Sequence, residues 1–255
     1  MKRNVLFASL LALAGLIFSA AAAGALEYPV YKLVPRAAKM TFATFAAGTN
    51  LDSAVVDYVV TDPEKAATIT TLHVGDRTTI GAGERVYLAG AVGDTFTLTD
   101  IGESSAGALV LLAPGTVIKD SPLSPLRVQG TKNNLTQILG PGLEHNTIGL
   151  MISNEAEIEY TLLAGHDIGM VSSHQNHSIK ISINNSYVTN SGRGLADLVG
   201  KVTNNDVVQI DIRNAIFWKN SGSDLTSKNL TKGHIMLNAE NCAFLSGEGK
   251  AGRFS

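Results

Sequence analysis

The chain has 255 residues, of which 45% are hydrophobic, 16% are charged and 25 are glycine. The charged share lies well below the roughly 25% of an average soluble protein, and the hydrophobic share is too high for an intrinsically disordered chain. Twenty Lys and Arg against 22 Asp and Glu give a net charge of −2, so no general positive field is present to attract nucleic acid. We therefore expect no nucleic-acid partner.

Residues 1–25 have the organisation of a secretory signal peptide. A basic pair precedes an apolar run from Val5 to Phe18, and small residues follow as far as Ala25. An uncleaved anchor is the alternative, because Val5 to Ala25 is about long enough to span a bilayer. If the signal peptide is cleaved, the sequence predicts a secreted or periplasmic protein without membrane contact. The single cysteine, Cys242, leaves the chain without an intramolecular disulfide.

One short helix and a series of short strands are expected next along the chain. Thr61, Pro63 and Glu64 form a capping-box pattern that predicts a helix start near Asp62. We assign residues 26–72 to an N-terminal cap with this helix over the first coil. Beyond it, β-rich runs alternate with Gly, Asn and Pro. These runs predict strands over residues 78–80, 85–88, 95–99, 108–112, 117–118, 126–128 and 136–139.

Three ten-residue segments in the last hundred residues repeat one pattern. They begin at Ile179, Val208 and Ile235 and align without gaps at offsets of 29 and 27. In each segment three apolar residues alternate with polar ones, an asparagine stands seventh, and a small residue follows it. A weaker copy, 25 residues earlier, begins at Asn154 and has Tyr160 in place of the asparagine.

A period of 25 to 29 residues with strand alternation suits one turn of a parallel β-solenoid, whose coils stack about 4.8 Å apart. The three apolar positions then form inward columns. Asn185, Asn214 and Asn241 would share one tight corner, because asparagine tolerates the left-handed conformation and its amide can bond the amide one coil away. We predict an asparagine ladder, with Cys242 as a small packed residue just beyond it.

Several segments carry a family resemblance. The run from Gly83 to Gly90, the strand at 95–99 and the run from Gly102 to Gly115 look like the opening coils of right-handed parallel β-helix proteins of the pectate-lyase-like superfamily. The segment 214–222 is similar to their asparagine–aromatic–asparagine coils. The resemblance implies an all-β, right-handed parallel β-helix, which we assign to residues 73–255. Known members include enzymes acting on acidic polysaccharides, adhesins and structural proteins, so the fold leaves the function open.

The polar positions between the inward columns define a candidate site on one sheet. A β-elimination needs a cation or Arg to neutralise a uronate carboxylate and a Lys or Arg to take the α-proton. We assign catalysis to Lys180, Asp211 and Arg213, and a Ca²⁺ ion to Glu157 with Asp211. The alternative is an ordinary salt-bridged surface. The substrate contacts expected around this site are Glu155, Ser182, Gln209, Asn238 and Trp218.

A histidine cluster is the second candidate site. His166 and Asp167 lie close in sequence to His174 and His177, in a connection between two repeats. Three ligands from this group would suit a metal, or a histidine there could act as an acid or base. The alternative is a set of solvated loop histidines.

Two classes of function follow from these observations. The first is an exported β-helix protein that binds an acidic polysaccharide and, if an enzyme, cleaves it as a lyase or hydrolase. The second is a non-catalytic structural or adhesive β-solenoid. Because few residues follow the last repeat, we also predict a homo-oligomer stacked through the C-terminal end.

Overall fold

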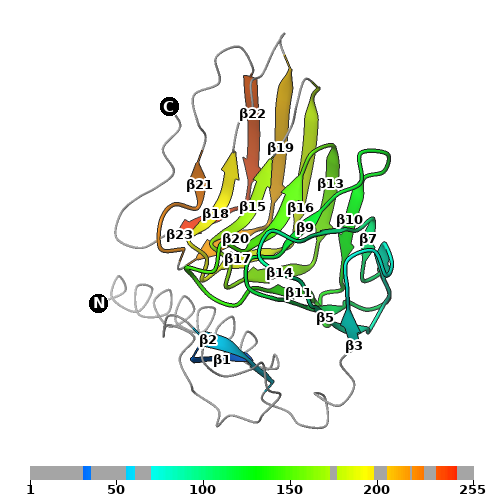
Figure 1. The fold of residues 1–255 in the computed structure, drawn as a ribbon. Helices are drawn as coiled ribbons and strands as arrows, with labels where there is room; N and C mark the ends of the chain where they lie inside the picture. The colour runs from blue at the N-terminus through cyan, green and yellow to red at the C-terminus, as the bar shows by residue number, and fades with distance from the viewer. Residues whose placement is uncertain are drawn as a thin grey trace, which may run out of the picture.

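The computed structural model describes residues 70–172, 177–197, 206–218, 220–226 and 234–245, together with the strands 31–35 and 56–60. The described residues between 70 and 245 form an all-β, right-handed parallel β-helix of about six coils, which confirms the predicted fold (Figure 1). The predicted signal peptide and the cap helix near Asp62 lie outside the described residues. None of the described residues belongs to a helix long and apolar enough to cross a membrane.

Each coil contributes strands to three parallel sheets, which we call sheets I, II and III in the order in which the chain passes through them. Sheet I carries the predicted repeats. Its strands are β4 (Thr79–Ile80), β7 (Asp100–Ile101), β10 (Leu126–Gln129), β13 (Glu155–Glu159), β16 (Ile179–Asn184), β19 (Val207–Arg213) and β22 (His234–Glu240).

Sheets II and III complete the coils. Sheet II consists of β3 (Thr70–Leu72), β5 (Arg85–Leu88), β8 (Leu109–Leu112), β11 (Thr136–Leu139), β14 (Thr161–Ala164), β17 (Tyr187–Thr189), β20 (Ile216–Trp218) and β23 (Ala243–Leu245). Sheet III consists of β6 (Thr95–Thr97), β9 (Val117–Lys119), β12 (Ile148–Ile152), β15 (Ile168–Ser172), β18 (Arg193–Asp197) and β21 (Leu225–Thr226). A separate antiparallel pair is formed by β1 (Tyr31–Pro35) and β2 (Val56–Val60).

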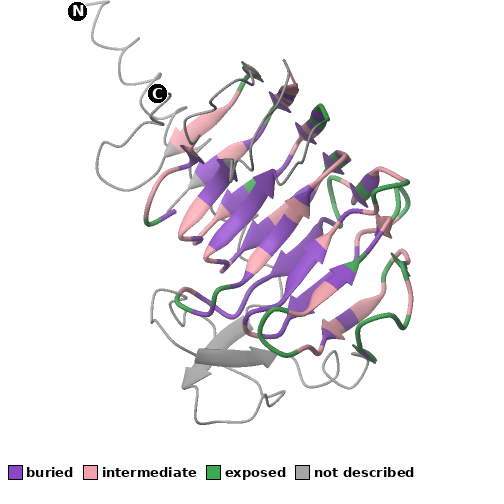
Figure 2. Ribbon diagram, turned by 45° about the horizontal axis from the view of Figure 1, so that its top comes forward, coloured by how far each residue is buried: buried purple, intermediate pink, exposed green. Residues whose placement is uncertain are grey.

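The core is a set of stacked aliphatic columns. Strand register places Ile181 beside Ile210 and Ile210 beside Leu237, and the columns on either side follow the same offsets. Ile181 is fully buried, as are most inward residues of the middle coils. Figure 2 shows buried residues along the strands and exposed residues in many of the connections. Exposed residues also occur at outward positions of sheet I, such as Glu157 and Lys180. The predicted columns are therefore confirmed.

The corner between sheets I and II contains the predicted asparagines. Asn185, Asn214 and Asn241 have φ angles of 50°, 51° and 52°, and Tyr160 adopts the same left-handed conformation one coil earlier. The Nδ2 of Asn241 donates to Oδ1 of Asn214 at 3.4 Å. Cys242 follows this corner and packs, half-buried, against the core. The asparagine corner is confirmed, and of the predicted side-chain ladder the described residues show the bond between Asn241 and Asn214.

The strands predicted before the repeats are present, with small shifts at their ends. The largest difference lies at 95–99, where β6 ends at Thr97 and β7 begins at Asp100. The chain passes from sheet III to sheet I at this point, and the side chain of Leu98 is buried in the core. The alternation of apolar and polar residues continues through this corner. The sequence pattern alone therefore does not show that β6 ends at Thr97 and that β7 begins at Asp100.

Candidate functional site

The solvent face of sheet I presents the two predicted polar columns. Register pairs Glu155 with Lys180, Lys180 with Gln209, and Gln209 with Met236. The second column runs one step further along the strands and consists of Glu157, Ser182, Asp211 and Asn238. The structure therefore brings these residues together as predicted, although it does not test their assigned roles.

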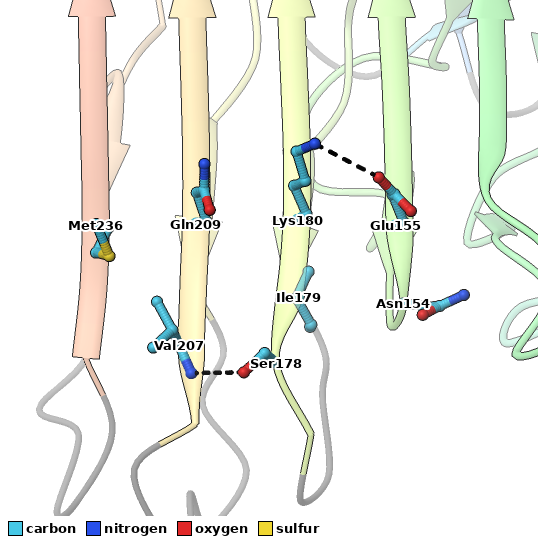
Figure 3. A pocket seen from close by; sticks show the side chains of 8 residues that line it. All are labelled: Asn154, Glu155, Ser178, Ile179, Lys180, Val207, Gln209 and Met236. Atoms are coloured by element: carbon cyan, nitrogen blue, oxygen red, sulfur yellow. Dashed lines mark hydrogen bonds and ion pairs between the residues drawn. The ribbon is translucent and has the colours of Figure 1, made fainter.

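A shallow pocket of about 370 Å³ opens on the first column (Figure 3). It extends across four neighbouring strands, from β13 to β22, at their N-terminal ends. Lys180 supplies its cation, and Met236, which is 50% exposed, supplies an apolar side chain. Its complete lining is Asn154, Glu155, Ser178, Ile179, Lys180, Val207, Gln209 and Met236.

Lys180 is the central charged residue of the pocket. Its Nζ lies 3.9 Å from Oε1 of Glu155 on the neighbouring strand, as the dashed line in Figure 3 marks. The Lys180 side chain remains 55% exposed, so this ion pair is screened by solvent and contributes little to stability. A ligand carboxylate could therefore replace Glu155 at small energetic cost.

The Asn154 edge of the pocket is held by a buried carboxylate. Asp120, at the end of β9, is fully buried and accepts hydrogen bonds from the backbone N–H of Ser153 at 2.9 Å and of Asn154 at 2.6 Å. It also accepts one from the Ser153 hydroxyl at 2.6 Å. At a neighbouring strand, the Ser178 hydroxyl accepts the N–H of Val207 at 3.0 Å. These bonds fix the turn through which the chain enters sheet I.

Asp211 organises the second column. Its Oδ1 accepts from Nδ2 of Asn238 and its Oδ2 from Nε2 of Gln209, both at 2.7 Å. The Asn238 hydrogen bond is the main cause that lowers the pKa of Asp211, and Gln209, Lys180 and Arg213 lower it further. Asp211 is therefore ionised at neutral pH. It orients the amide of Gln209 at the pocket.

The other charged residues of this face form exposed ion pairs. Arg127 lies 3.7 Å from Glu157, and Arg213 lies 3.5 Å from Glu240. All four side chains are more than half exposed, which limits each pair to about 1 kcal/mol or less. Arg213, which we assigned to catalysis, thus lies outside the residues that line the pocket.

The predicted Ca²⁺ ligands are Glu157 on β13 and Asp211 on β19. Strand β16 lies between them, so their backbones are two inter-strand spacings apart, about 10 Å. A shared ion would have to compete with Arg127 for Glu157 and with two amides for Asp211. Across the described residues, no three His, Cys, Asp or Glu side chains gather in a way that could hold a metal. The Ca²⁺ ion stays a prediction.

The histidine cluster is divided by the fold. His166 is fully buried at the start of the turn into β15, where its Nε2 bonds the carbonyl of Ile138 at 3.1 Å. The Asp167 carboxylate accepts backbone N–H groups from a preceding connection, including that of Glu144 at 2.6 Å. His177 lies beyond the other end of β15 and bonds the carbonyl of Ser153. His174 lies outside the described residues.

Trp218 is on a different sheet from the other predicted contacts. It belongs to β20 of sheet II, in register with Thr189 and Leu245, as the repeat alignment predicts. The sequence reasoning missed Asn154 and Ser178 as pocket residues. Their signal was their position at the start of each repeated strand, where a connection joins the sheet.

The fold and this face define a class of protein, a parallel β-solenoid with a polar, pocketed face on one sheet. No protein-family model matches the chain, and no curated protein matches it.

Proposed function

We propose that this protein is an exported β-helix protein that binds an acidic polysaccharide on the solvent face of sheet I. The observation that carries the proposal is the pocket, where one accessible ammonium group lies among amide and hydroxyl groups. The resemblance to the pectate-lyase-like superfamily supports the same ligand class.

The side chains of the pocket match the chemistry of a uronate chain. Lys180 can form a charge-assisted hydrogen bond to a sugar carboxylate. Asn154, Ser178 and Gln209 offer donors and acceptors for sugar hydroxyls. Met236 offers an apolar surface for the C–H face of a ring. Because the pocket crosses four strands, we propose that the sugar chain runs across them, parallel to the solenoid axis.

Binding to polygalacturonate and alginate, measured by isothermal titration calorimetry at low salt, tests the proposal. Lys180→Ala removes the cation, and we expect an affinity loss of about 10-fold or more, the worth of one hydrogen bond to a charged group. Lys132→Ala is the matched control, because Lys132 is an exposed lysine in the connection between β10 and β11. Equal affinity of wild type and Lys180→Ala would refute the proposed site.

Glu155 gives a test in the opposite direction. Its carboxylate competes with a ligand carboxylate for Lys180. Glu155→Gln removes that competition and one negative charge while keeping the side-chain size, so binding of an acidic chain should become tighter. A neutral glucan used as the ligand should not distinguish Glu155→Gln from wild type.

Cleavage is the extension of this proposal. In a β-elimination, Lys180 would act as the base only in its deprotonated form, and Arg213 would then be the cation that stabilises the uronate charge. Lys180 takes the α-proton, the bond to the leaving glycosidic oxygen breaks as the C=C bond forms, and the leaving oxygen takes a proton from solvent. The assay is the ultraviolet absorbance of an unsaturated product, measured with and without Ca²⁺. Absorbance that requires Lys180 and Asp211 would support an enzyme, whereas binding without product would support a lectin-like protein.

The second candidate function is a non-catalytic structural or adhesive surface. The observation that favours it is that Lys180, Arg127 and Arg213 each have a glutamate partner on the same face. A face whose charges balance one another can display a surface without any small ligand. Absence of signal on a glycan array, with both uronans included, would select this function.

A further inference from the structure

The apolar columns of the core are uncovered at the C-terminal end of the solenoid. The inward residues of β19 are all buried. Register continues their columns onto Ile235, Leu237 and Ala239 of β22, of which the first two are half-buried and the third is exposed. Strand β22 is the terminal strand of sheet I in the described part of the chain (Figure 1). We call Ile235, Leu237 and Ala239, together with Phe244, the end surface.

Phe244 brings the same exposure to sheet II. Its ring centroid lies 5.1 Å from that of Phe217, its register partner one coil earlier. Phe217 has 0% of its surface exposed, whereas Phe244 is only half-buried. Removing apolar surface from water is favourable, so an end surface of this composition favours a partner that continues the core.

The N-terminal end of the solenoid differs from the C-terminal end. The first described strands of the three sheets are β3, β4 and β6, and their inward residues Leu72, Ile80 and Phe96 are 8%, 0% and 3% exposed. Head-to-tail stacking of two copies would need an open surface at this end as well. The contrast between the two ends therefore favours contact between two end surfaces, which gives a closed dimer with two-fold symmetry.

The backbone of β22 offers groups for such a contact. The carbonyl of Glu240 accepts the N–H of Asn214 at 3.0 Å, so the polar backbone groups of Glu240 point towards the neighbouring strand. Successive residues of a strand direct their N–H and C=O groups to alternate sides. The groups of Ile235, Leu237 and Ala239 therefore point to the open edge of sheet I. An edge strand of this kind can pair with a strand of another chain.

The side chains of β22 are complementary to themselves in one register. A two-fold axis normal to sheet I at Leu237 pairs β22 antiparallel with β22 of the second copy. Leu237 then lies beside Leu237 of the second copy, and Ile235 lies beside Ala239 of the second copy, so a large side chain meets a small one on each side of the axis. Because the axis is normal to the sheet, inward side chains stay inward and outward side chains stay outward.

We propose that two copies of this chain form a dimer by antiparallel pairing of β22 with β22 at the C-terminal ends of their solenoids. Sheet I then continues from one copy into the other, and the core columns of each copy are covered by those of its partner. Both polar faces lie on the same side of the dimer. This contact does not depend on polysaccharide binding.

Light scattering after size-exclusion chromatography tests the dimer, with the full chain expressed with its own N-terminal segment. At about 100 μM we expect twice the mass of one chain, together with a urea midpoint that rises with protein concentration. A monomer at this concentration overturns the proposal. A mass that grows beyond that of the dimer also overturns it, because open stacking would then replace the closed contact.

Two variants of β22 examine the side chains and the backbone separately. Leu237→Asp places a carboxylate at the centre of the contact and should weaken the dimer at least about 100-fold. Met236→Asp is its matched control, because it adds the same charge on the outward side of the same strand and should leave the dimer intact.

Ala239→Pro removes an N–H that points to the open edge and should give a monomer with the circular dichroism spectrum of wild type. Ala239→Ser keeps this N–H and should remain dimeric. Equal dimer affinity of Ala239→Pro and Ala239→Ser overturns the proposal, whether or not Leu237→Asp folds.

A crosslink tests the register of the two strands. In a Cys242→Ser background, which removes the single native thiol, Leu237→Cys faces its own copy across the axis with Cα atoms about 5.5 Å apart, within reach of a disulfide. Ile235→Cys lies four residues out of register with its own copy, about 14 Å away. We expect a covalent dimer of Leu237→Cys under mild oxidation and none of Ile235→Cys. Equal crosslinking of the two variants overturns the antiparallel pairing.

Discussion

His166 makes the stability of the solenoid depend on pH in a defined window. Its imidazole is fully buried, and its Nδ1 has no hydrogen-bond partner among the described residues. Burial lowers the pKa of His166 to about 4, although its hydrogen bond to Ile138 and the charge of Asp167 act in the opposite direction. The folded protein therefore keeps His166 neutral where the unfolded chain already binds a proton.

The magnitude follows from the difference between the two pKa values. The unfolded pKa is 6.5 and the folded pKa is about 4, and each pKa unit corresponds to about 1.4 kcal/mol. Well above pH 6.5, His166 is neutral in both states and does not change the free energy of unfolding. As the pH falls from 6.5 towards 4, the free energy of unfolding decreases, because the unfolded chain binds a proton at His166 that the folded protein does not. The total loss is about 3 kcal/mol, of which about 2 kcal/mol falls between pH 7 and pH 5.

Urea unfolding at pH 7 and pH 5 measures this effect, because most carboxylates remain ionised at pH 5. The comparison variant is His166→Gln, which keeps an N–H donor for Ile138 but does not titrate. We expect the free energy of unfolding of wild type to fall about 2 kcal/mol more than that of His166→Gln. Equal pH dependence in the two proteins would refute the reasoning, whatever the stability of the variant at pH 7.

Three further predictions concern the corners of the coils, and urea unfolding at pH 7 measures each of them. Asp120→Ala leaves the N–H groups of Ser153 and Asn154 without their acceptor and should cost about 3 kcal/mol, whereas Asp120→Asn should cost less. Asn214→Ala should cost about 1–2 kcal/mol, because its φ is 51°, and Asn214→Gly should cost less than Asn214→Ala. Gly140→Ala places a Cβ against the carbonyl oxygen of Gly165 and against Nδ1 of His166 and should cost about 2 kcal/mol or more; equal stability would show that the turn can relax.

The sequence repeat predicted how the coils stack, because that stacking follows from the spacing of the apolar residues. Ile181, Ile210 and Leu237 recur at a coil's length, and a parallel stack is the arrangement that buries such residues together. The polar columns followed for the same reason, because successive residues of a strand alternate between its faces. Glu155, Lys180 and Gln209 were therefore accessible from the sequence, whereas Asn154 and Ser178, which precede their strands, were not.

The features that the sequence did not reveal depend on contacts between different connections. Asp120 and His166 each bond a backbone group more than 25 residues away, and no local pattern indicates that partner. The sequence also did not reveal that all four residues of β8, including Leu111, are buried, and the reason is different. A run of four apolar residues fits a strand with one buried face as well as a strand with two buried faces. Only the three-dimensional structure shows that both faces of β8 are buried.

The one-over-one register of the coils has a consequence for how the molecule can change in size. Each strand of sheet I pairs only with its counterparts in the adjacent turns, at offsets of 21 to 30 residues. Removing or duplicating one entire winding would restore every neighbour relation, whereas losing a single residue within a strand would turn its interior side chains outward. Genetic change can therefore lengthen this molecule in whole units, and each added unit would extend the polar surface on which a polymer could lie.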